Sequence, residues 1–374
     1  MMPRNRVVFV LSLFAFAACI FAGFLTIAPN RLASGQSLTL WQLGGIPGAA
    51  LTGACVALLA LSFVPIARGV EYIVLGLAIA VFVFQLFAAG FLATGSLTSA
   101  PHGTRVSLGW AFWTTGFCLA MIAIDALQRL NAGTLARLAA LAIIVAATAL
   151  ITSGGWFDGL SLMREYQTRQ DEFAAALGRH CLLVAVAVFL AVIIGAPLGL
   201  YVARGPQRSA GTFGVLNMLQ TIPSVALFGL LIAPLSALGI GGIGAVPAII
   251  ALVLYSLLPV VRNTEAGISG VDRGVIDAAR GMGLTPAQIL WRIELPLGMP
   301  IFLAGLRIVA VQAIGLAIVA ALIGAGGLGS FVFQGIGQYA TDLVLLGALP
   351  TIALALAADF ILALLAGFFE RSPS

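Results

Sequence analysis

The sequence predicts an all-α integral membrane protein with about ten transmembrane helices. Of its 374 residues, 61% are hydrophobic and only 8% are charged, and the mean hydropathy of +1.13 is far above that of soluble domains. Unsatisfied backbone groups are so costly in lipid that only helices and closed barrels cross it, and a helix needs about 20 apolar residues to do so. The apolar runs of this chain are long and do not alternate with polar residues, so we interpret them as helices.

Ten apolar runs are expected as spanning helices, five in each half of the chain. They lie at about residues 7–28, 46–64, 72–94, 108–124, 138–152, 182–202, 212–235, 245–261, 299–322 and 343–367. Arg4 and Arg6 before the first run resemble the start of a signal peptide. The run is longer than a signal-peptide core, however, so we expect the first helix to remain uncleaved.

The arginines predict the orientation of the chain in the membrane. If Arg4 and Arg6 are inside, ten crossings leave a set of arginines in the cytoplasm: Arg68, Arg129, Arg137, Arg204, Arg208, Arg262, Arg273, Arg280, Arg292 and Arg371. A smaller set falls outside: Arg31, Arg105, Arg164, Arg169 and Arg179. Cytoplasmic loops carry such an excess of positive charge, so both termini are predicted to be cytoplasmic.

A polar segment, residues 153–179, separates residues 1–152 from residues 180–374 and is predicted to be an external linker. Its charged and aromatic residues suit a solvated, partly helical connector, or a segment that docks an external partner. The halves share no motif that would indicate an inverted repeat. We therefore expect two different modules of about five helices each.

The composition also excludes several kinds of chemistry. All 18 basic residues are arginines, and a P-loop needs a lysine that reaches the β- and γ-phosphates, so any ATP hydrolysis must be done by a partner. The cysteines lack CxxC spacing and are interpreted as small buried hydrophobic residues, so no metal site is expected: Cys19, Cys55, Cys118 and Cys181. We expect no catalytic residues and no cofactor bound by this chain.

The longest predicted cytoplasmic loop, residues 262–296, has the local chemistry of two short helices joined by a turn. Asp272 is a plausible N-cap for the first helix, and glycines 281 and 283 end it. Thr285 and Gln288 have the spacing of a capping box, with Pro286 at the first position of the second helix. Pro296 is expected to end that second helix.

Small residues on such a pair of helices allow a close approach to a groove on another protein. Ala278, Ala279 and Gly283 would let the backbone come close, and Leu284 would supply an apolar contact at the turn. Rigid helices at an interface transmit a partner's movement to the spanning helices as rigid-body motion.

The loop resembles the coupling loop of ABC-importer permeases, usually written Glu-Ala-Ala, Gly, Ile-x-Leu-Pro. Three residues separate Asp277-Ala278-Ala279 from Gly283, and nine more separate Gly283 from a run of four residues, 293–296. That run contains Ile293, Leu295 and Pro296. Asp277 in place of Glu is the single departure from the pattern, and it keeps the charge.

Three further stretches resemble the permeases of glycine betaine, carnitine and choline uptake: Leu219–Ser224, Leu258–Thr264 and Leu322–Gly329. The resemblance covers about residues 180–370. It implies a permease core in the C-terminal half, a second permease copy, cytoplasmic subunits that carry ATP and Mg, and an external or periplasmic substrate-binding protein. It also implies the bacterial inner membrane, and it leaves residues 1–152 as an N-terminal extension whose role the sequence does not indicate.

A small set of polar residues could line a path through the membrane. Arg307 and Asp359 are charged within predicted spans, which is costly and therefore typical of functional sites. Arg307 could equally extend toward the cytoplasmic surface as an anchor. Gln220, Thr221 and Pro223 form a polar, kinkable point where freed carbonyls could line a cavity, although helix packing explains them equally well.

The glycine-rich run of residues 324–329 suits a broken helix or a re-entrant turn on the outer side. A secondary transporter or channel for small polar solutes is the main alternative function, since its hydropathy would be the same. That alternative leaves the loop around Asp277 unexplained. A membrane enzyme is a more distant alternative because no cluster of His, Asp and Glu is evident.

Overall fold

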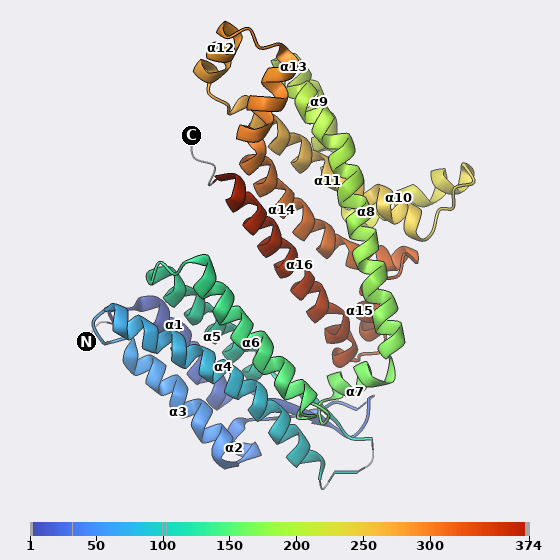
Figure 1. The fold of residues 1–374 in the computed structure, drawn as a ribbon. Helices are drawn as coiled ribbons and strands as arrows, with labels where there is room; N and C mark the ends of the chain where they lie inside the picture. The colour runs from blue at the N-terminus through green and yellow to red at the C-terminus, as the bar shows by residue number, and fades with distance from the viewer. Residues whose placement is uncertain (1–2, 32, 99, 102, 371–374) are drawn as a thin grey trace. The chain divides into compact units, whose positions relative to one another are not determined.

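The computed structural model describes residues 3–31, 33–98, 100–101 and 103–370, and Arg371 lies outside them. Two units form: Met1–Thr168 and Arg169–Ser374. Both are mainly helical (Figure 1). Within the described residues, no group of His, Cys, Asp and Glu could hold a metal ion. Three of the cysteines are buried as expected, whereas Cys181 is exposed.

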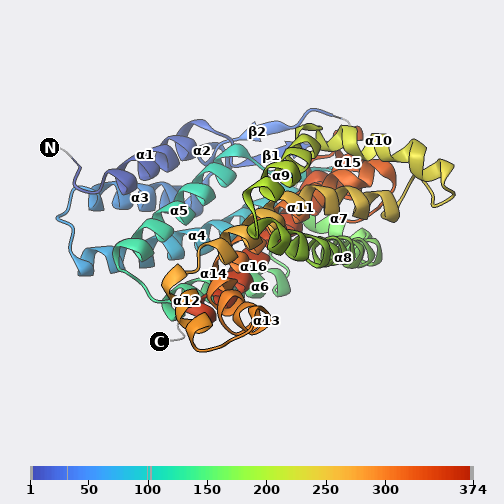
Figure 2. The same cartoon turned by 90° about the horizontal axis from the view of Figure 1, so that it is seen from above.

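The described residues of the first unit form seven helices: α1 (Arg6–Phe21), α2 (Leu40–Leu43), α3 (Gly45–Leu61), α4 (Arg68–Leu97), α5 (Trp110–Arg129), α6 (Thr134–Ser153) and α7 (Ser161–Thr168). Helices α1, α3, α4 and α5 lie side by side (Figure 2) and bury one apolar core, with Leu51, Ala78 and Leu119 at its centre. In α6, by contrast, a single residue, Ile151, is buried within the unit.

A small antiparallel sheet, which the all-α prediction missed, joins the ends of these helices. Its order is β2 (Gln36–Leu38), β1 (Leu25–Ala28), β3 (Arg105–Leu108), with Leu25 opposite both Leu38 and Leu108. The first predicted span, residues 7–28, is therefore too long: its helix ends at Phe21 and strand β1 follows. A Cβ on Gly109 would lie 2.2 Å from the carbonyl oxygen of Gly23, so these glycines allow the chain segments to cross.

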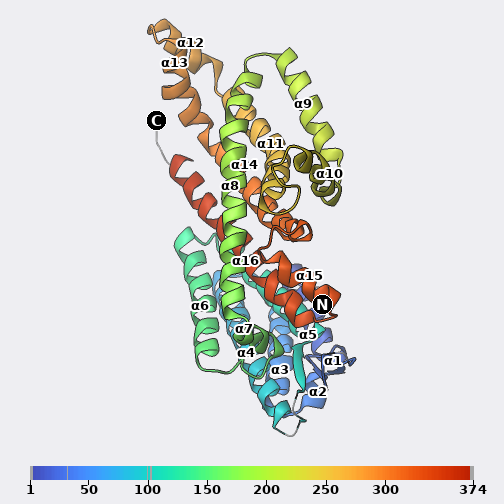
Figure 3. The ribbon, with the colours of Figure 1, turned by 90° about the vertical axis from the view of Figure 1, so that its right-hand side faces the viewer.

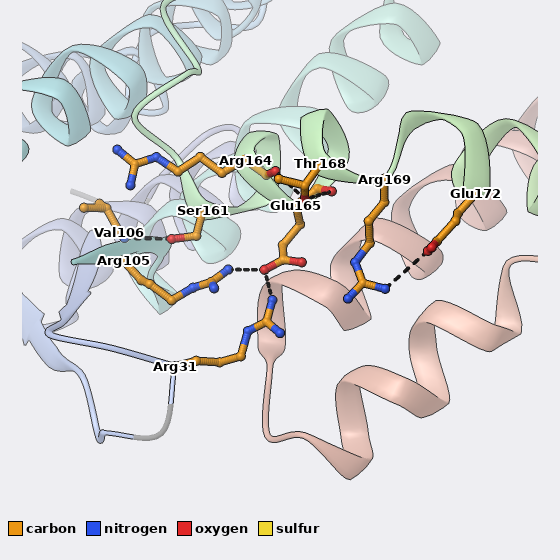
Figure 4. A network of polar contacts seen from close by, with 9 residues as sticks. All are labelled: Arg31, Arg105, Val106, Ser161, Arg164, Glu165, Thr168, Arg169 and Glu172. Atoms are coloured by element: carbon orange, nitrogen blue, oxygen red, sulfur yellow. Dashed lines mark hydrogen bonds and ion pairs between the residues drawn. The ribbon is translucent and has the colours of Figure 1, made fainter. Parts of the chain in front are cut away.

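Helix α7 is held to the sheet by polar contacts (Figure 4). Glu165 accepts hydrogen bonds from Arg31 and Arg105, and the amide of Val106 donates to Ser161 Oγ at 2.8 Å. Burial raises the pKa of Glu165, but the two arginines more than offset this, so that its pKa is lowered overall.

The second unit contains α8 (Gln170–Ala203), α9 (Pro206–Thr221), α10 (Ser224–Ala237), α11 (Ala245–Ser269), α12 (Arg273–Gly281), α13 (Pro286–Ile289), the π-turn η1 (Leu290–Glu294), α14 (Leu295–Val319), the 3₁₀ turn η2 (Ala320–Ile323), α15 (Gly329–Gly337) and α16 (Thr341–Glu370). Helix α11 packs against both α8 and α14, and α14 packs against α16. Helices α12 and α13 lie at one end of this bundle, and α15 lies at the other (Figure 1).

Small residues let the long helices of this unit approach closely, as is common in membranes. A Cβ on Gly199 of α8 would lie 2.5 Å from Thr264 of α11. Where α11 crosses α14, a Cβ on Gly298 would lie 2.7 Å from the carbonyl oxygen of Gly267. The two backbones are therefore in direct contact at that crossing.

Within the described residues, seven helices are long and apolar enough to cross a membrane, or eight if α9 and α10 together form one broken span. All ten predicted runs are largely helical. However, α1 and α3, with 16 and 17 residues, are only about 24–26 Å long, shorter than a hydrocarbon core of about 30 Å. The single helix predicted at 212–235 is wrong: α9 and α10 meet at 99° (Figure 3).

Two predicted loop boundaries also differ from the structure. The polar segment 153–179 becomes helical again at Gln170, where the charged start of α8 begins. The predicted loop 262–296 begins only after α11 ends at Ser269, and the helical stretch that runs into α14 already begins at Pro286. Amphipathic ends thus extend the spanning helices beyond the purely apolar runs that hydropathy detects.

Candidate functional site

Helix α12 begins where the sequence predicts. Asp272 is its N-cap: its side-chain oxygen Oδ1 accepts from the amides of Gly274 at 2.7 Å and Val275 at 3.3 Å. This satisfies two of the amides that lack a partner inside the helix. The predicted cap is confirmed.

The turn after α12 depends on Gly283. The amide of Gly283 donates to the carbonyl of Arg280 at 2.9 Å, and that of Leu284 donates to the carbonyl of Ala279 at 3.1 Å. These paired bonds form a Schellman motif, which needs a left-handed residue, and Gly283 has φ +82°. The glycine is therefore required by backbone geometry, in addition to the close approach that the sequence suggested.

Helix α13 starts with the predicted capping box. Thr285 Oγ1 accepts from the amide of Gln288 at 3.4 Å, and Gln288 Oε1 accepts from the amide of Thr285 at 2.8 Å. Pro286 occupies the first helical position, where a missing amide has no cost.

The expectation that Pro296 ends the second helix is wrong. One π-turn, η1, carries the helix from α13 into α14, with the amide of Leu295 donating to the carbonyl of Leu290 five residues back. This wider turn changes the hydrogen-bond register just before Pro296, which has no amide to donate. Helical structure therefore connects the turn at Gly283 to α14 without a flexible joint.

The predicted contact residues divide into an outward and an inward set. Asp277, Ala278, Gly283 and Pro296 are exposed, while Leu284, Ile293 and Leu295 are half-buried. Ala279, which we expected at the contact surface, is fully buried. Its carbonyl accepts the hydrogen bond that closes the Schellman turn between the two short helices.

Exposed apolar side chains on this segment were missed in the sequence. Met282 and Trp291 are 73% and 72% exposed, and Val275 is also exposed. The sequence could have indicated these side chains, because two short capped helices cannot bury every apolar residue that they carry. Among ionic contacts, Asp277 pairs with Arg280 at 3.0 Å, and both side chains are exposed.

A second unpredicted contact ties this segment to α8. Arg204 at the end of α8 donates to Glu294 from Nη1 to Oε1 at 3.0 Å and from Nη2 to Oε2 at 2.6 Å. The hydrogen bonds from Arg204 to this carboxylate raise the pKa of the guanidinium. The pair is bidentate, which fixes orientation as well as distance. Glu294 occupies the unspecified position of the Ile-x-Leu-Pro pattern.

The polar point predicted in the seventh span lies where α9 and α10 meet. Gln220 Nε2 donates to the carbonyl of Tyr255 at 2.9 Å, and the hydroxyl of Tyr255 donates to the carbonyl of Ile222. Thr221 Oγ1 donates to the carbonyl of Met218 at 2.7 Å, and Pro223 is the N-cap of α10. These bonds brace the bend against α11.

Arg307 and Asp359, for which the sequence indicated no partner, form an ion pair between α14 and α16. Arg307 Nε and Nη2 each lie 2.9 Å from an oxygen of Asp359. Their side chains are 35% and 43% exposed in this unit. Arg307 thus binds across two helices and is not extended toward the helix end as an anchor.

The glycine-rich run forms the broken helix that the sequence suggested. Gly324, Gly326 and Gly327 all have positive φ, and they separate η2 from α15. Two residues of α8 bond to this region, one to the glycine-rich turn and one to α14. Arg179 Nε donates to the carbonyl of Ala325 at 3.2 Å, and His180 Nε2 lies 3.1 Å from the carbonyl oxygen of Ile314.

Two different protein families match the two halves of the chain. Residues 195–371 match the family described as binding-protein-dependent transport system inner membrane component. Residues 4–163 match the family described as ABC transporter permease YehY, N-terminal domain.

Curated relatives match about half of this chain but most of their own length. The carnitine transport permease protein OpuCB of Listeria monocytogenes is 41% identical over 184 residues, 49% of this chain and 82% of the relative. The osmoprotectant import permease protein OsmW of Salmonella typhimurium is 43% identical over 184 residues, 49% of this chain and 85% of the relative. The choline transport system permease protein OpuBB of Bacillus subtilis is 37% identical over 197 residues, 53% of this chain and 88% of the relative.

Among solved structures, a chain of the inward-facing MetNI methionine ABC transporter has a similar fold. It is 22% identical with a TM-score of 0.50, over 55% of this chain and 99% of that one. At this identity the similarity concerns the fold alone.

Proposed function

This chain belongs to the family of ABC-importer permease subunits related to glycine betaine, carnitine and choline permeases, and we propose that it forms the path by which such osmoprotectants enter the cell. The relatives are named for carnitine, choline and osmoprotectants, which are quaternary amines or zwitterions. The alternative of an ion-driven transporter or a channel would not need the capped segment that follows α11.

The observation that carries the coupling mechanism is the continuous path from α12 to α14. Residues 272–296 present exposed Asp277, Ala278 and Met282 at the tip, and η1 joins α13 to α14 without a break. A partner that moves the tip would therefore move α14 as a rigid body. In this proposal Asp277, Ala278, Gly283 and Leu284 meet a separate ATPase, while Ala279, Ile293, Leu295 and Pro296 keep the segment rigid.

The proposed assembly contains a cytoplasmic ATP-binding subunit, an external or periplasmic substrate-binding protein and a second permease copy. ATP and Mg bind to the ATPase partner. Residues 1–152 are an N-terminal membrane extension, residues 153–179 a linker that includes α7, and residues 180–374 the permease core. With α1 and α3 counted as short crossings, the chain crosses the bacterial inner membrane about ten times and both termini are cytoplasmic.

Reconstitution tests this function. The chain, its ATPase and its binding protein are placed in proteoliposomes, and uptake of radiolabelled glycine betaine is measured with and without ATP. We expect uptake to require ATP and the ATPase. Uptake driven by an ion gradient in the absence of the ATPase would contradict the proposal.

A further inference from the structure

The Arg307–Asp359 pair lies near the middle of its two spans. Arg307 is 12 residues from Leu295, the first residue of α14, which corresponds to about 18 Å of helix. Asp359 is 11 residues from Glu370, the last residue of α16, or about 16 Å. A hydrocarbon core is about 30 Å thick, so the pair lies close to its midplane if these helix ends lie at the membrane surface.

The pair is partly exposed on an apolar surface. More than a third of each charged side chain is open in this unit, beside exposed Ile308 of α14 and exposed Leu356 of α16. Charged groups facing lipid at this depth are costly, and intramembrane ionisable residues almost always face protein or a water-filled cavity. The pair is therefore expected to face protein or water and not lipid, as it would on the wall of a water-filled cavity.

The chemistry of the pair matches a zwitterion. It offers one cation and one anion side by side, and it is neutral as a whole. A solute with a carboxylate and a quaternary ammonium group, such as glycine betaine, can replace each charge by its own: carboxylate to Arg307, ammonium to Asp359. A simple cation such as choline would leave the Arg307 guanidinium without an anion, which is unfavourable away from bulk water.

We propose that Arg307 and Asp359 form a transient mid-membrane binding site for zwitterionic solutes, opened when a zwitterion inserts between the two side chains. This inference rests on the proposed function as an importer and adds the class of solute that the path itself prefers. Selection by the chain would then act in addition to selection by the binding protein.

The test compares the wild-type complex with the double variant R307M/D359L. Two apolar residues of similar size can replace an ion pair without loss of folding. Assembly of the variant with its ATPase, and ATP hydrolysis by that complex without solute, therefore check that the variant is folded. Binding protein is supplied in saturating amounts, loaded with glycine betaine or with choline. Because the same binding protein is used throughout, the ratio of the two uptake rates isolates the permease. I352L, an apolar change on the same helix, is the matched control.

We expect R307M/D359L to lower betaine uptake relative to choline uptake by about tenfold, the value of one charged hydrogen bond, with I352L at the wild-type ratio. The inference is overturned if the double variant assembles and keeps the wild-type ratio, as a purely structural pair would. It is also overturned if the wild type imports choline and no zwitterion, although the importer function would then stand.

A second readout does not depend on transport. Ala304 is exposed one turn before Arg307, and A304C in a C181S background tests whether water reaches this face. A membrane-impermeant methanethiosulfonate should label A304C, and glycine betaine should slow the labelling. I143C, at an exposed apolar position of α6, is the control that we expect to face lipid and to remain unlabelled. Absence of labelling at A304C, or labelling that betaine does not affect, would contradict the site.

Discussion

Replacing Arg204 with methionine removes the cation that holds Glu294 at the base of α14. Glu294 has only 4% of its side chain exposed, and both of its carboxylate oxygens bond to Arg204. The variant therefore leaves a nearly buried carboxylate without its counter-ion. It also disconnects the end of α8 from the π-turn through which we expect movement of residues 272–285 to reach α14.

The size of the effect follows from the burial of the two partners. Breaking a fully buried pair costs about 3–5 kcal/mol, whereas an exposed pair contributes about 0.2–1 kcal/mol. The Arg204 side chain is 45% exposed, so solvent screens part of the interaction. We expect R204M to lower the free energy of unfolding by about 1.5–3 kcal/mol.

A double-mutant cycle measures this coupling. R204M, E294L and R204M/E294L are purified in detergent, and their unfolding free energies are obtained by denaturant titration. Because E294L removes the stranded carboxylate, the double variant should regain at least about 1 kcal/mol over the sum of the single effects. In proteoliposomes, R204M should also lower the amount of solute imported per ATP hydrolysed.

An additive cycle, with coupling below about 0.3 kcal/mol, would refute the energetic argument. A normal transport ratio in a destabilised R204M would refute the mechanical one, because it would show that α14 responds to the partner without the brace from α8.

Three further predictions follow from backbone geometry and charge. G283A should weaken ATPase binding measured by pull-down, because φ +82° costs a Cβ-bearing residue about 1 kcal/mol. G283N should bind the ATPase more tightly than G283A, because Asn tolerates the left-handed region. Equal binding by the two variants would contradict the Schellman role of Gly283. G298A should lower Tm, because its Cβ would meet the backbone of Gly267, whereas G315A, which has open space around it, should not; equal Tm values would exclude the close crossing. Since the pKa of Glu165 is lowered on folding, its stabilisation is present above about pH 4.5 and is lost as the pH falls through the folded value. The protection of the α7 amides, measured as their exchange rate relative to the intrinsic rate at each pH, should therefore fall at acid pH, and E165Q should remove that dependence.

Local chemistry made the structure of residues 272–296 largely predictable. The N-cap at Asp272, the turn at Gly283 and the capping box at Thr285 each involve residues within a few positions of one another. Such contacts depend on the sequence between them and on little else. The role of Pro296 was mistaken because the π-turn before it carries the helix past the position where proline has no amide to donate.

Contacts between distant residues were not predictable from one sequence. Arg307 and Asp359 are 52 residues apart, and Arg204 and Glu294 are 90 apart. The sequence shows that each of these residues is charged, but the crossing of two helices decides which residue becomes its partner. Hydropathy also could not separate α9 from α10, because both halves of that run are apolar and the bend is set by Pro223 and the brace from Tyr255.

The N-terminal part of the chain shows a different reason why a prediction failed. Strand β1 follows α1 in an apolar stretch, and a continuous apolar run does not distinguish a helix from a short strand. Pairing with β3, some 80 residues later in the chain, gives the strand its hydrogen bonds. This pairing, together with that of β2 on the other edge of β1, identifies the segment as a strand.

The central claim, that residues 272–296 couple this chain to an ATPase, is tested most directly by site-specific photo-crosslinking in the assembled complex. A photoreactive amino acid is placed at Met282, in the exposed turn after α12, or at Tyr339, which is 93% exposed in the turn between α15 and α16. We predict a crosslink to the ATPase subunit from position 282 that changes in yield when ATP is added, and none from position 339. Absence of the crosslink at 282, or equal crosslinking at both positions, would contradict the account.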